Sequence, residues 1–397
     1  MTAPISCRHC CACGGLSGTQ LFDEVWPVVG IGTARIGIRI CSDCGFVLQD
    51  PVIQPELLGR YYTQTSNYTN PGRSGRPSKT KISAVDRQLR MLHRFTPGRG
   101  SAMQIGCSDG YTLHRLREDG WKVKGVDPSP EASRLAADMW NVHVEIGFFE
   151  EWAENVRERF DLIVLTHILE HLYDPVRVLT KSRELLRKGG QILIEVPVLE
   201  EPDSWPPGYF TLEHLNYFAC DTLILCLSQA GLSLGLAEPV IVTESVEYPI
   251  LTCIARPGPE KVANWDSGKL RAQKALATVA AYYEREKSLW NQLDSRLRDA
   301  TSYVEHAVIW GAGIHTSQLL ARTELEKHIK IDYLVDSDKS KWGLHLGPYE
   351  IKDPEEIDYT DSVLGIVVSS FDSEREILHS LKDRSPGASV IPLYNSI

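Results

Sequence analysis

One stretch decides the fold of this chain: residues 102–113 read AMQIGCSDGYTL. A short apolar strand runs into a turn that contains Gly106 and Gly110, and a helix follows the turn. The next strand, over residues 122–126, ends at Asp127. Glycine lets the backbone come close to a ligand, and an acid about 20 residues further on can accept hydrogen bonds from ribose hydroxyls. The order of strand, turn, helix, strand and acid therefore predicts a nucleotide-binding α/β unit.

Length and composition set the limits for this prediction. The chain has 397 residues, too many for one ordinary hydrophobic core, so we expect two or three domains. Apolar residues make up 43% and charged residues 24%, as in a globular protein. We find neither an apolar run long enough to span a bilayer nor a secretory signal, and therefore expect a cytoplasmic protein without a membrane partner. The net charge of −10 argues against a nucleic-acid partner.

Six of the ten cysteines lie in the first 44 residues, which points to a metal site. Cys10 and Cys13 form one pair with two residues between them, and Cys41 and Cys44 form a second. A glycine follows each pair, where the backbone has to turn back toward a metal. This spacing is typical of a tetrahedral zinc ribbon with four thiolate ligands. Four cysteine ligands leave no position for water, so we expect the Zn²⁺ to be structural.

The pairing of the first cysteines has an alternative. Cys7 and Cys10 are also separated by two residues, and Cys11 lies between the candidate ligands. Gly14 favours the pair Cys10 and Cys13, because arginine or cysteine follows the other choices. Residues 1–60 carry four basic and five acidic side chains, whereas a ribbon that binds phosphate is expected to be basic.

Beyond the ribbon, strands and helices alternate up to about residue 254, which predicts a parallel, doubly wound sheet. Within this part we expect a helix over residues 175–186, closed by glycines, and a strand over 191–196. Residues 197–217 form an irregular insertion. The run Pro257-Gly258-Pro259 marks a boundary, and a long helix over about 260–299 follows it. The expected domains are 1–60, 61–257 and 258–397.

A second glycine turn lies in the last of these domains. Residues 307–313 read AVIWGAG, and a later strand ends at Asp336. Thr316 occupies the third glycine position of the dinucleotide fingerprint. We therefore expect a nucleotide-type α/β fold that serves packing or substrate contact, with a nicotinamide site as the alternative.

The central domain resembles the class I S-adenosylmethionine-dependent methyltransferases, which have a Rossmann-like sheet. Three segments carry the resemblance: QIGCSDG at 104–110, GVD at 125–127 and FDLIVLTHILEH at 160–171. The resemblance implies S-adenosylmethionine as cofactor. It also implies the residues around that cofactor, with Asp127 on the ribose hydroxyls, the stretch at 148–150 beside the adenine and a flanking histidine: Gly106, Ser108, Gly110, Asp127, Phe149 and His167. An NAD-type fold that has lost its ligand is the alternative.

The whole layout narrows the resemblance further. A zinc ribbon, a methyltransferase core and a second Rossmann-like domain together resemble the sugar C-methyltransferases of deoxysugar biosynthesis. Those enzymes methylate carbon 3 of nucleotide-linked 4-keto sugars, and their signature is Tyr-His-Glu-His followed by an aromatic residue three positions later. This chain has TLEHLNY at 211–217. Glu213, His214 and Tyr217 match the signature, whereas Thr211 and Leu212 replace its tyrosine and first histidine.

Methylation of carbon needs a base that removes a proton beside the ketone. Histidine suits this task near neutral pH, and we expect His214 to be the base, with Glu213 positioning it or holding a sugar hydroxyl. A second polar group has to stabilise the enolate oxygen. The resemblance implies His171 in the active site and, more loosely, Tyr68. Each of these side chains has packing as its alternative role.

Two further functions compete with this reading. An O- or N-methyltransferase is the nearer one, because of the altered Thr211 and Leu212, and a non-enzymatic adaptor is the other. Residues 73–99 contain eight Lys or Arg and one acid, Asp86. These cations attract a diphosphate-bearing substrate or form a solvated helix face. The sequence predicts no oligomeric state.

Overall fold

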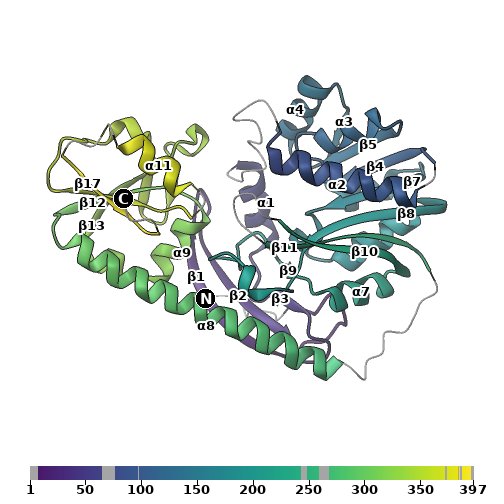
Figure 1. The fold of residues 1–397 in the computed structure, drawn as a ribbon, viewed down its shortest axis with the longest axis horizontal. Helices are drawn as coiled ribbons and strands as arrows, with labels where there is room; N and C mark the ends of the chain where they lie inside the picture. Colours follow the sequence, from purple (N-terminus) through teal and green to yellow (C-terminus); the bar gives the residue numbers. More distant parts are fainter. Residues whose placement is uncertain are drawn as a thin grey trace.

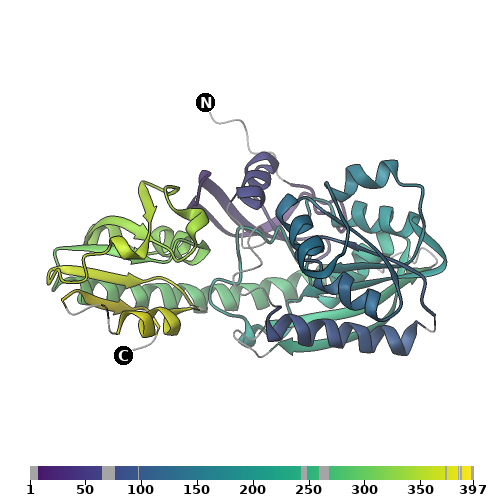
Figure 2. The same ribbon diagram turned by 90° about the horizontal axis from the view of Figure 1, so that it is seen from above.

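The computed structural model of the protein describes residues 8–64, 77–96, 98–242, 248–258, 268–371, 373–382, 384 and 387–394. Three sheets follow one another along the chain, and one long helix, α8 (Gly268–Thr301), runs beneath them from the central part to the C-terminal part (Figure 1). The view from above shows the two larger parts at opposite ends of this helix (Figure 2).

The first sheet is antiparallel and completed by a distant segment. Its strands lie in the order β1-β2-β3-β9, with bounds Gly18–Val28, Gly32–Cys41, Val47–Gln49 and Asn216–Tyr217. Strand β9 belongs to the stretch that the sequence predicts as an irregular insertion, and it pairs Tyr217 with Val47. Helix α1 (Pro55–Gln64) follows this sheet. The insertion therefore ties the first sheet to the central part of the chain.

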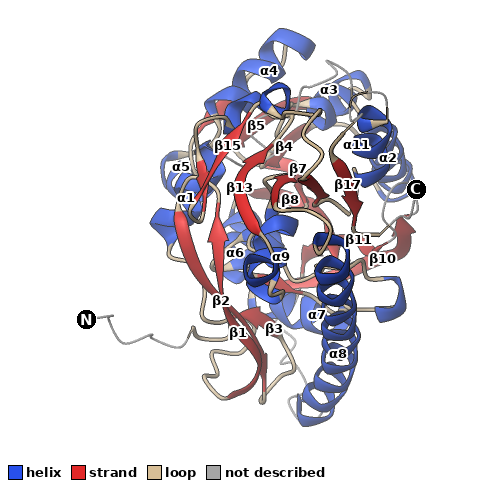
Figure 3. Ribbon diagram, turned by 90° about the vertical axis from the view of Figure 1, so that its left-hand side faces the viewer, coloured by secondary structure: helices blue, strands red, loops and turns tan. Residues whose placement is uncertain are grey.

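The central sheet has seven strands in the order β10-β11-β8-β7-β4-β5-β6. Five of them are parallel, and the hairpin of β10 and β11 runs antiparallel to β8. The bounds are Leu232–Val242, Tyr248–Pro257, Leu186–Pro197, Phe160–Thr166, Ser101–Ile105, Lys122–Asp127 and Val144–Ile146. Helices flank these strands (Figure 3). The doubly wound α/β sheet expected from the first glycine turn is thus confirmed.

Alternating side chains explain why helices cover both faces of this sheet. In β4, Ala102 packs with α2 and α3, whereas Met103 packs in the cluster that holds α5, α6 and α7. A strand buried on both faces reads as a continuous apolar run, as β7 does with FDLIVLT.

Capping side chains start several helices: Ser78 caps α2, Ser129 caps α4 and Asp174 caps α6. The bounds are α2 Lys79–Phe95, α3 Tyr111–Glu118, α4 Pro130–Trp140, α5 Phe149–Asn155, α6 Pro175–Glu184 and α7 Cys220–Gln229.

One boundary differs from the prediction. Helix α6 ends at Glu184, and β8 begins at Leu186 rather than near residue 191. The pairing of β8 with β7 shifts between the partners Leu186 and Gln191, so the residues between them form a bulge with Gly189 at φ +81°. The glycines therefore lie inside the strand and do not close the helix.

The C-terminal sheet has six strands in the order β14-β15-β13-β12-β16-β17. All neighbours are parallel except β14 and β15. The strands are His345–Leu346, Tyr349–Lys352, Lys330–Val335, His306–Trp310, Leu364–Val368 and Ser389–Pro392, and the helices are α9 Ile314–Arg322, α10 Leu325–His328 and α11 Glu374–Leu381. The assignment of this α/β part to the Rossmann-like class stays a prediction, as do the three domain boundaries.

Aromatic side chains join the first sheet, the insertion and α8 in one core. The Phe210 ring of the insertion lies 6.0 Å from that of Phe22 in β1 and 5.6 Å from that of Tyr282 in α8. Trp205 stacks on Tyr209 at 4.6 Å. The insertion is thus held between β1 on one side and α8 on the other.

Among the described helices, none has both the length and the hydropathy needed to cross a membrane.

Candidate active site

The first glycine turn connects β4 to α3 in a left-handed backbone conformation. Gly106 and Gly110 have φ angles of +65° and +76°, and Ser108 between them has +48°. A Cβ atom on Gly106 would lie 2.0 Å from Cδ1 of Ile168, so glycine is needed where the turn passes the loop after β7. This close approach places the turn directly beside the segment that carries His167 and His171.

Asp127 lies at the end of β5, next to the same turn. Its Oδ2 accepts the backbone N–H of Ser108 at 2.9 Å, and its Oδ1 accepts that of Ser129 at 2.9 Å. Burial raises the pKa of Asp127, and the backbone N–H groups oppose this rise. Each oxygen keeps a further lone pair for a ligand hydroxyl. The residues of the predicted ribose site are therefore brought together.

His167 lies between two buried carboxylates. Its Nδ1 is 3.4 Å from Glu170 Oε1, and its Nε2 is 3.4 Å from Glu195 Oε1. Glu195 also accepts hydrogen bonds at 2.9 Å from Arg87 and Gln88 of α2. Burial alone would raise the pKa of Glu195, but the hydrogen bond with His167 and the nearby positive charges lower it to about 2. His167 is thus fixed beside the glycine turn, as a residue next to the cofactor would be.

His171 and His214 lie side by side although they are far apart in the sequence. Glu213, which precedes His214, is 42 positions from His171. Their ring centroids are 4.9 Å apart. The Nδ1 atom of His171 lies 3.0 Å from the carbonyl oxygen of Glu213 and 2.9 Å from the hydroxyl of Tyr62. Burial, with a smaller contribution from His171, lowers the pKa of His214 to about 3, so this imidazole is neutral at pH 7.

The Glu213 side chain points to a tyrosine of α1. Its Oε1 accepts a hydrogen bond of 2.6 Å from the hydroxyl of Tyr61. Tyr61 and its neighbour Tyr62 were not among the expected site residues; the only sequence signal was an aromatic pair at the end of a helix before a loop. Tyr68, expected in that loop, lies outside the described residues.

The two altered signature positions have structural roles. The Leu212 side chain is fully buried, and Thr211 Oγ1 accepts the backbone N–H of His214 at 3.3 Å. Tyr217 packs on His214 with ring centroids 5.9 Å apart. The hydroxyl of the nearby Tyr209 donates to the carbonyl of Val198 at 3.2 Å.

Helices α8 and α9 hold the segment that carries Glu213 and His214. Glu286 of α8 accepts the backbone N–H of Gly208 at 2.6 Å, and Gln318 of α9 donates to the carbonyl of Phe210 at 3.1 Å. Arg322 of α9 forms an ion pair of 3.1 Å with Glu286. The C-terminal part thereby helps to position the candidate active site.

Phe149 and the cations of α2 lie in the body of the central domain. Phe149 is buried at the start of α5, while the Phe148 side chain beside it is exposed. Four of the α2-region cations form ion pairs with acids of the same domain: Lys81 with Asp109, Arg87 with Glu195, Arg94 with Glu238 and Arg99 with Asp119. The Arg94 side chain is 66% exposed, so part of this set does form a solvated helix face.

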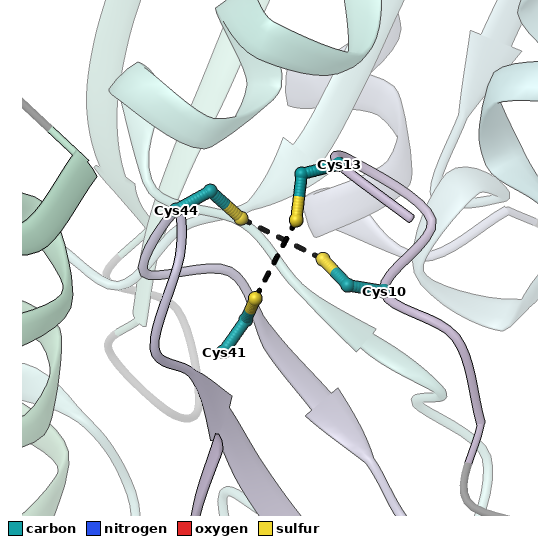
Figure 4. Close-up of side chains that lie close together, drawn as sticks. All are labelled: Cys10, Cys13, Cys41 and Cys44. Carbon is teal, nitrogen blue, oxygen red and sulfur yellow. Dashed lines mark hydrogen bonds between the residues drawn. The ribbon is translucent and has the colours of Figure 1, made fainter. Parts of the chain in front are cut away.

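Four thiols near the N-terminus converge on one point (Figure 4). The Sγ atoms of Cys10 and Cys44 are 3.6 Å apart, and those of Cys13 and Cys41 are 3.5 Å apart. A zinc ion with bonds of about 2.3 Å to four sulfurs requires sulfur separations of about 3.8 Å. The residues present therefore fit a tetrahedral metal. Cys11 lies beside them, with its Sγ 3.6 Å from Asn216 Oδ1.

Comparison with known proteins supports a methyltransferase. Residues 81–235 match the family described as a methyltransferase domain. The tRNA U34 carboxymethyltransferase of Shewanella denitrificans is 32% identical over 112 residues, which cover 26% of this chain and 33% of that protein. The C-methyltransferase NovU of Streptomyces niveus is 26% identical over 222 residues, covering 55% of this chain and 51% of NovU. The chain thus spans a third to a half of the length of these two relatives.

A third relative and two solved structures complete the comparison. The ubiquinone biosynthesis O-methyltransferase of Idiomarina loihiensis is 23% identical over 41% of this chain and 68% of its own. The [4+2]-cyclase SpnF aligns with a TM-score of 0.41 and 16% identity over 52% of this chain and 97% of its own. The N-methyltransferase NodS of Bradyrhizobium japonicum aligns with a TM-score of 0.37 and 18% identity. This alignment covers 45% of this chain and 88% of NodS. The family match thus shows that residues 81–235 of this chain are similar to a methyltransferase domain.

Proposed function

We propose that this chain transfers the methyl group of S-adenosylmethionine to carbon 3 of a nucleotide-linked 4-keto-deoxysugar. The observation that carries the proposal is the pair of His171 and His214, whose rings lie 4.9 Å apart. His171 of this pair lies on the loop after β7, which the glycine turn contacts through Ile168, and His214 lies on the insertion before β9. The similarity to NovU, named a C-methyltransferase, supports the same chemistry over 222 residues.

The donor set fits the cofactor. Asp127 accepts one backbone N–H on each oxygen, which leaves acceptor capacity for two ribose hydroxyls. In this proposal Gly106, Ser108 and Gly110 border the methionine and ribose. Phe149 and His167 border the rest of the cofactor. Bound S-adenosylmethionine supplies an electrophilic methyl group.

The side chains of the cluster then have separate tasks. His214 accepts the proton from carbon 3, and the electron pair of the broken C–H bond moves toward the keto oxygen. His171 stabilises the negative charge on that oxygen, while Glu213 holds a sugar hydroxyl. With the cofactor bound, this electron pair would form the new bond from carbon 3 to the methyl carbon while the methyl–sulfur bond breaks, its electrons stay on sulfur and S-adenosylhomocysteine leaves.

Product analysis tests the accepting atom. We would incubate the protein with S-adenosylmethionine and a panel of nucleotide-linked 4-keto-6-deoxysugars, follow the substrate mass and locate the new methyl group by NMR. A methyl on carbon 3 is the expected result. A methyl on oxygen or nitrogen would overturn the proposal. Such a result would favour the alternative, an O- or N-methyltransferase. This alternative exists because the buried Leu212 stands where the related enzymes have histidine.

Proton exchange tests the base directly. Without cofactor, the protein should exchange the proton on carbon 3 with deuterated solvent, because only methylation of carbon needs that proton to leave. His214→Asn should slow the exchange and the methylation by about 10²–10⁴-fold. His93→Asn, on the outer side of α2 against Asp119, is the matched control and should change neither rate.

The absence of nucleic-acid partners stays a prediction, since one relative is named for tRNA.

We also propose that Cys10, Cys13, Cys41 and Cys44 hold a structural Zn²⁺. The convergence of the four sulfurs supports this assignment. Cys44 is buried in the same apolar cluster as Phe46 and Phe218, so the metal would stabilise the junction with the central domain. Elemental analysis should find at least one zinc per chain, and Cys41→Ser should remove the metal from the four-cysteine site and lower the melting temperature. A protein that keeps its melting temperature after complete chelation would contradict a structural role.

A further inference from the structure

A second convergence of metal-ligating groups lies inside the candidate active site. Glu170, His171 and His214 each offer one ligand atom, and these atoms all lie within 4.8 Å of one another. The three residues come from two segments, the loop after β7 and the insertion before β9. Both segments are fixed: Asn216 of the insertion donates to the carbonyl of Leu169 at 2.9 Å.

The carboxylate of this cluster is buried among histidines. The Glu170 side chain is 2% exposed, and its Oε1 lies 3.4 Å from His167 Nδ1 and 3.9 Å from His171 Nε2. An ionised carboxylate in such a place carries a large desolvation cost, which a bound cation would offset.

The hydrogen bonds of His171 decide which of its two ring nitrogens carries the lone pair that can face this carboxylate. The carbonyl oxygen of Glu213, 3.0 Å from His171 Nδ1, can only accept a hydrogen bond, and the hydroxyl of Tyr62 at 2.9 Å can accept as well as donate. Both contacts are satisfied when the proton is on Nδ1, which is the tautomer we assign. In the neutral ring the lone pair is then on Nε2, on the side of Glu170. Fixing one nitrogen through a carbonyl is the usual way in which proteins prepare a histidine to bind metal with the other. Lone pairs of an imidazole and a carboxylate therefore point toward the same space.

We infer that Glu170, His171 and His214 form a binding site for a divalent cation of the zinc class, separate from the four cysteines. Two imidazoles and one carboxylate are a ligand set that suits Zn²⁺ and its neighbours and leaves coordination positions open. Bonds of about 2.1 Å place tetrahedral ligands about 3.4 Å apart. The three atoms, now within 4.8 Å of one another, have to draw together to about 3.4 Å when the metal binds.

Occupation of this site has a consequence that rests on the proposed function. A His214 nitrogen that coordinates a metal cannot accept the proton from carbon 3. The cation should therefore inhibit methyl transfer and compete with the sugar substrate. Binding of the metal itself does not depend on the reaction.

Cobalt binding to the full-length protein tests the site. The protein is first loaded with zinc at the four cysteines, and Co²⁺ is then titrated while absorption is recorded. A second metal per chain with visible d–d bands, and without the intense thiolate-to-cobalt band, is the expected result. Glu170→Gln should weaken this binding at least tenfold. The matched control is Glu213→Gln, whose carboxylate faces Tyr61 and should leave the affinity unchanged.

Wild-type protein supplies a test that does not depend on the folding of a variant. Co²⁺ should shift or broaden the NMR signals of the His171 and His214 rings while those of the exposed His379 stay unchanged. Binding of only one metal per chain, or equal affinity in Glu170→Gln, would overturn the inference. Protein with zinc at the four cysteines alone that methylates no keto sugar would refute the proposed function alone, since it leaves the cobalt result untouched.

Discussion

Two glycine turns, one after β4 and one after β12, each direct a backbone N–H at an aspartate that ends or follows the neighbouring strand. The N–H of Ser108 lies 2.9 Å from Asp127 Oδ2, and that of Ala312 lies 3.0 Å from Asp336 Oδ2. The glycines Gly106 and Gly311 both have positive φ angles, of +65° and +114°. The two turns therefore present a ligand with nearly the same local backbone geometry.

The side chains around the two aspartates differ. Lys341 Nζ lies 2.8 Å from Asp336 Oδ2, and the side chains of both residues are largely buried. For Asp127, the described ranges contain no ion pair with lysine or arginine; its partners are backbone N–H groups. The C-terminal aspartate is thus neutralised by its own chain, whereas the central one keeps acceptor capacity for hydroxyl groups of a ligand.

A histidine adds to the difference. His315, at the start of α9, contacts Ser369 Oγ at 2.9 Å through Nδ1 and the hydroxyl of Tyr394 at 2.6 Å through Nε2. These residues fill the ends of the C-terminal strands, where an open α/β sheet binds its ligand. The comparison teaches that a glycine turn and an acid predict a backbone geometry, while the neighbouring side chains decide whether a nucleotide can use it.

Removal of the two aspartates should break the comparison most clearly. Asp127→Ala takes away an acceptor for two hydroxyls at about 1.5–3 kcal/mol each, so we expect affinity for S-adenosylmethionine to fall by about 4 kcal/mol, roughly a thousandfold. Asp336→Ala should leave this affinity unchanged. Isothermal titration calorimetry measures both. Equal losses in the two variants would mean that the C-terminal turn also binds the cofactor.

The ion pair at the C-terminal turn gives the next effect. Lys341→Met leaves the buried carboxylate of Asp336 without its partner and should cost about 3 kcal/mol of local stability. The double variant with Asp336→Asn should recover most of this loss, because no unpaired charge remains. Urea-dependent hydrogen exchange of the β12 and β13 amides measures the stability. A small single effect would show that Lys341 is not what closes this turn.

The order of elements in the central sheet could be predicted because its signals are local. An apolar run, a glycine turn and an acid lie within 26 residues, 102–127, and their spacing is set by strand and helix geometry. Strand β9 could not be predicted. It has two residues, and it joins a sheet whose other strands end 167 positions earlier, at Gln49. No local periodicity reports such a pairing.

The site was predictable to the same extent. The cysteine pairs have ligand spacing, and the histidine motifs could be located from the family resemblance, so their residues were expected before they were seen together. The partners that orient them were not. The bond from Tyr61 to Glu213 spans 152 positions, and the buried environment of Glu170 depends on the packing of two loops. Contacts of this kind follow from the tertiary structure alone.

The smallest expected effect concerns pH. Burial lowers the pKa of His315 to about 4, whereas an unfolded histidine titrates near 6.5. Between these values the unfolded chain binds a proton that the folded chain does not. The free energy of unfolding should therefore fall as the pH drops from 6.5 to 4, with a contribution from His315 of about 2.5 kcal/mol.

His315→Gln should remove this contribution and keep the contacts. A glutamine amide can donate and accept where the imidazole meets Ser369 and Tyr394, but it does not titrate. Stability measured in urea at several pH values should thus depend less on pH in the variant than in the wild type, while the control His379→Gln on exposed α11 keeps the original slope. An unchanged slope in His315→Gln would show that water reaches the imidazole. The ends of the C-terminal strands would then be open like those of the central sheet, and Lys341 alone would account for the difference between the two turns.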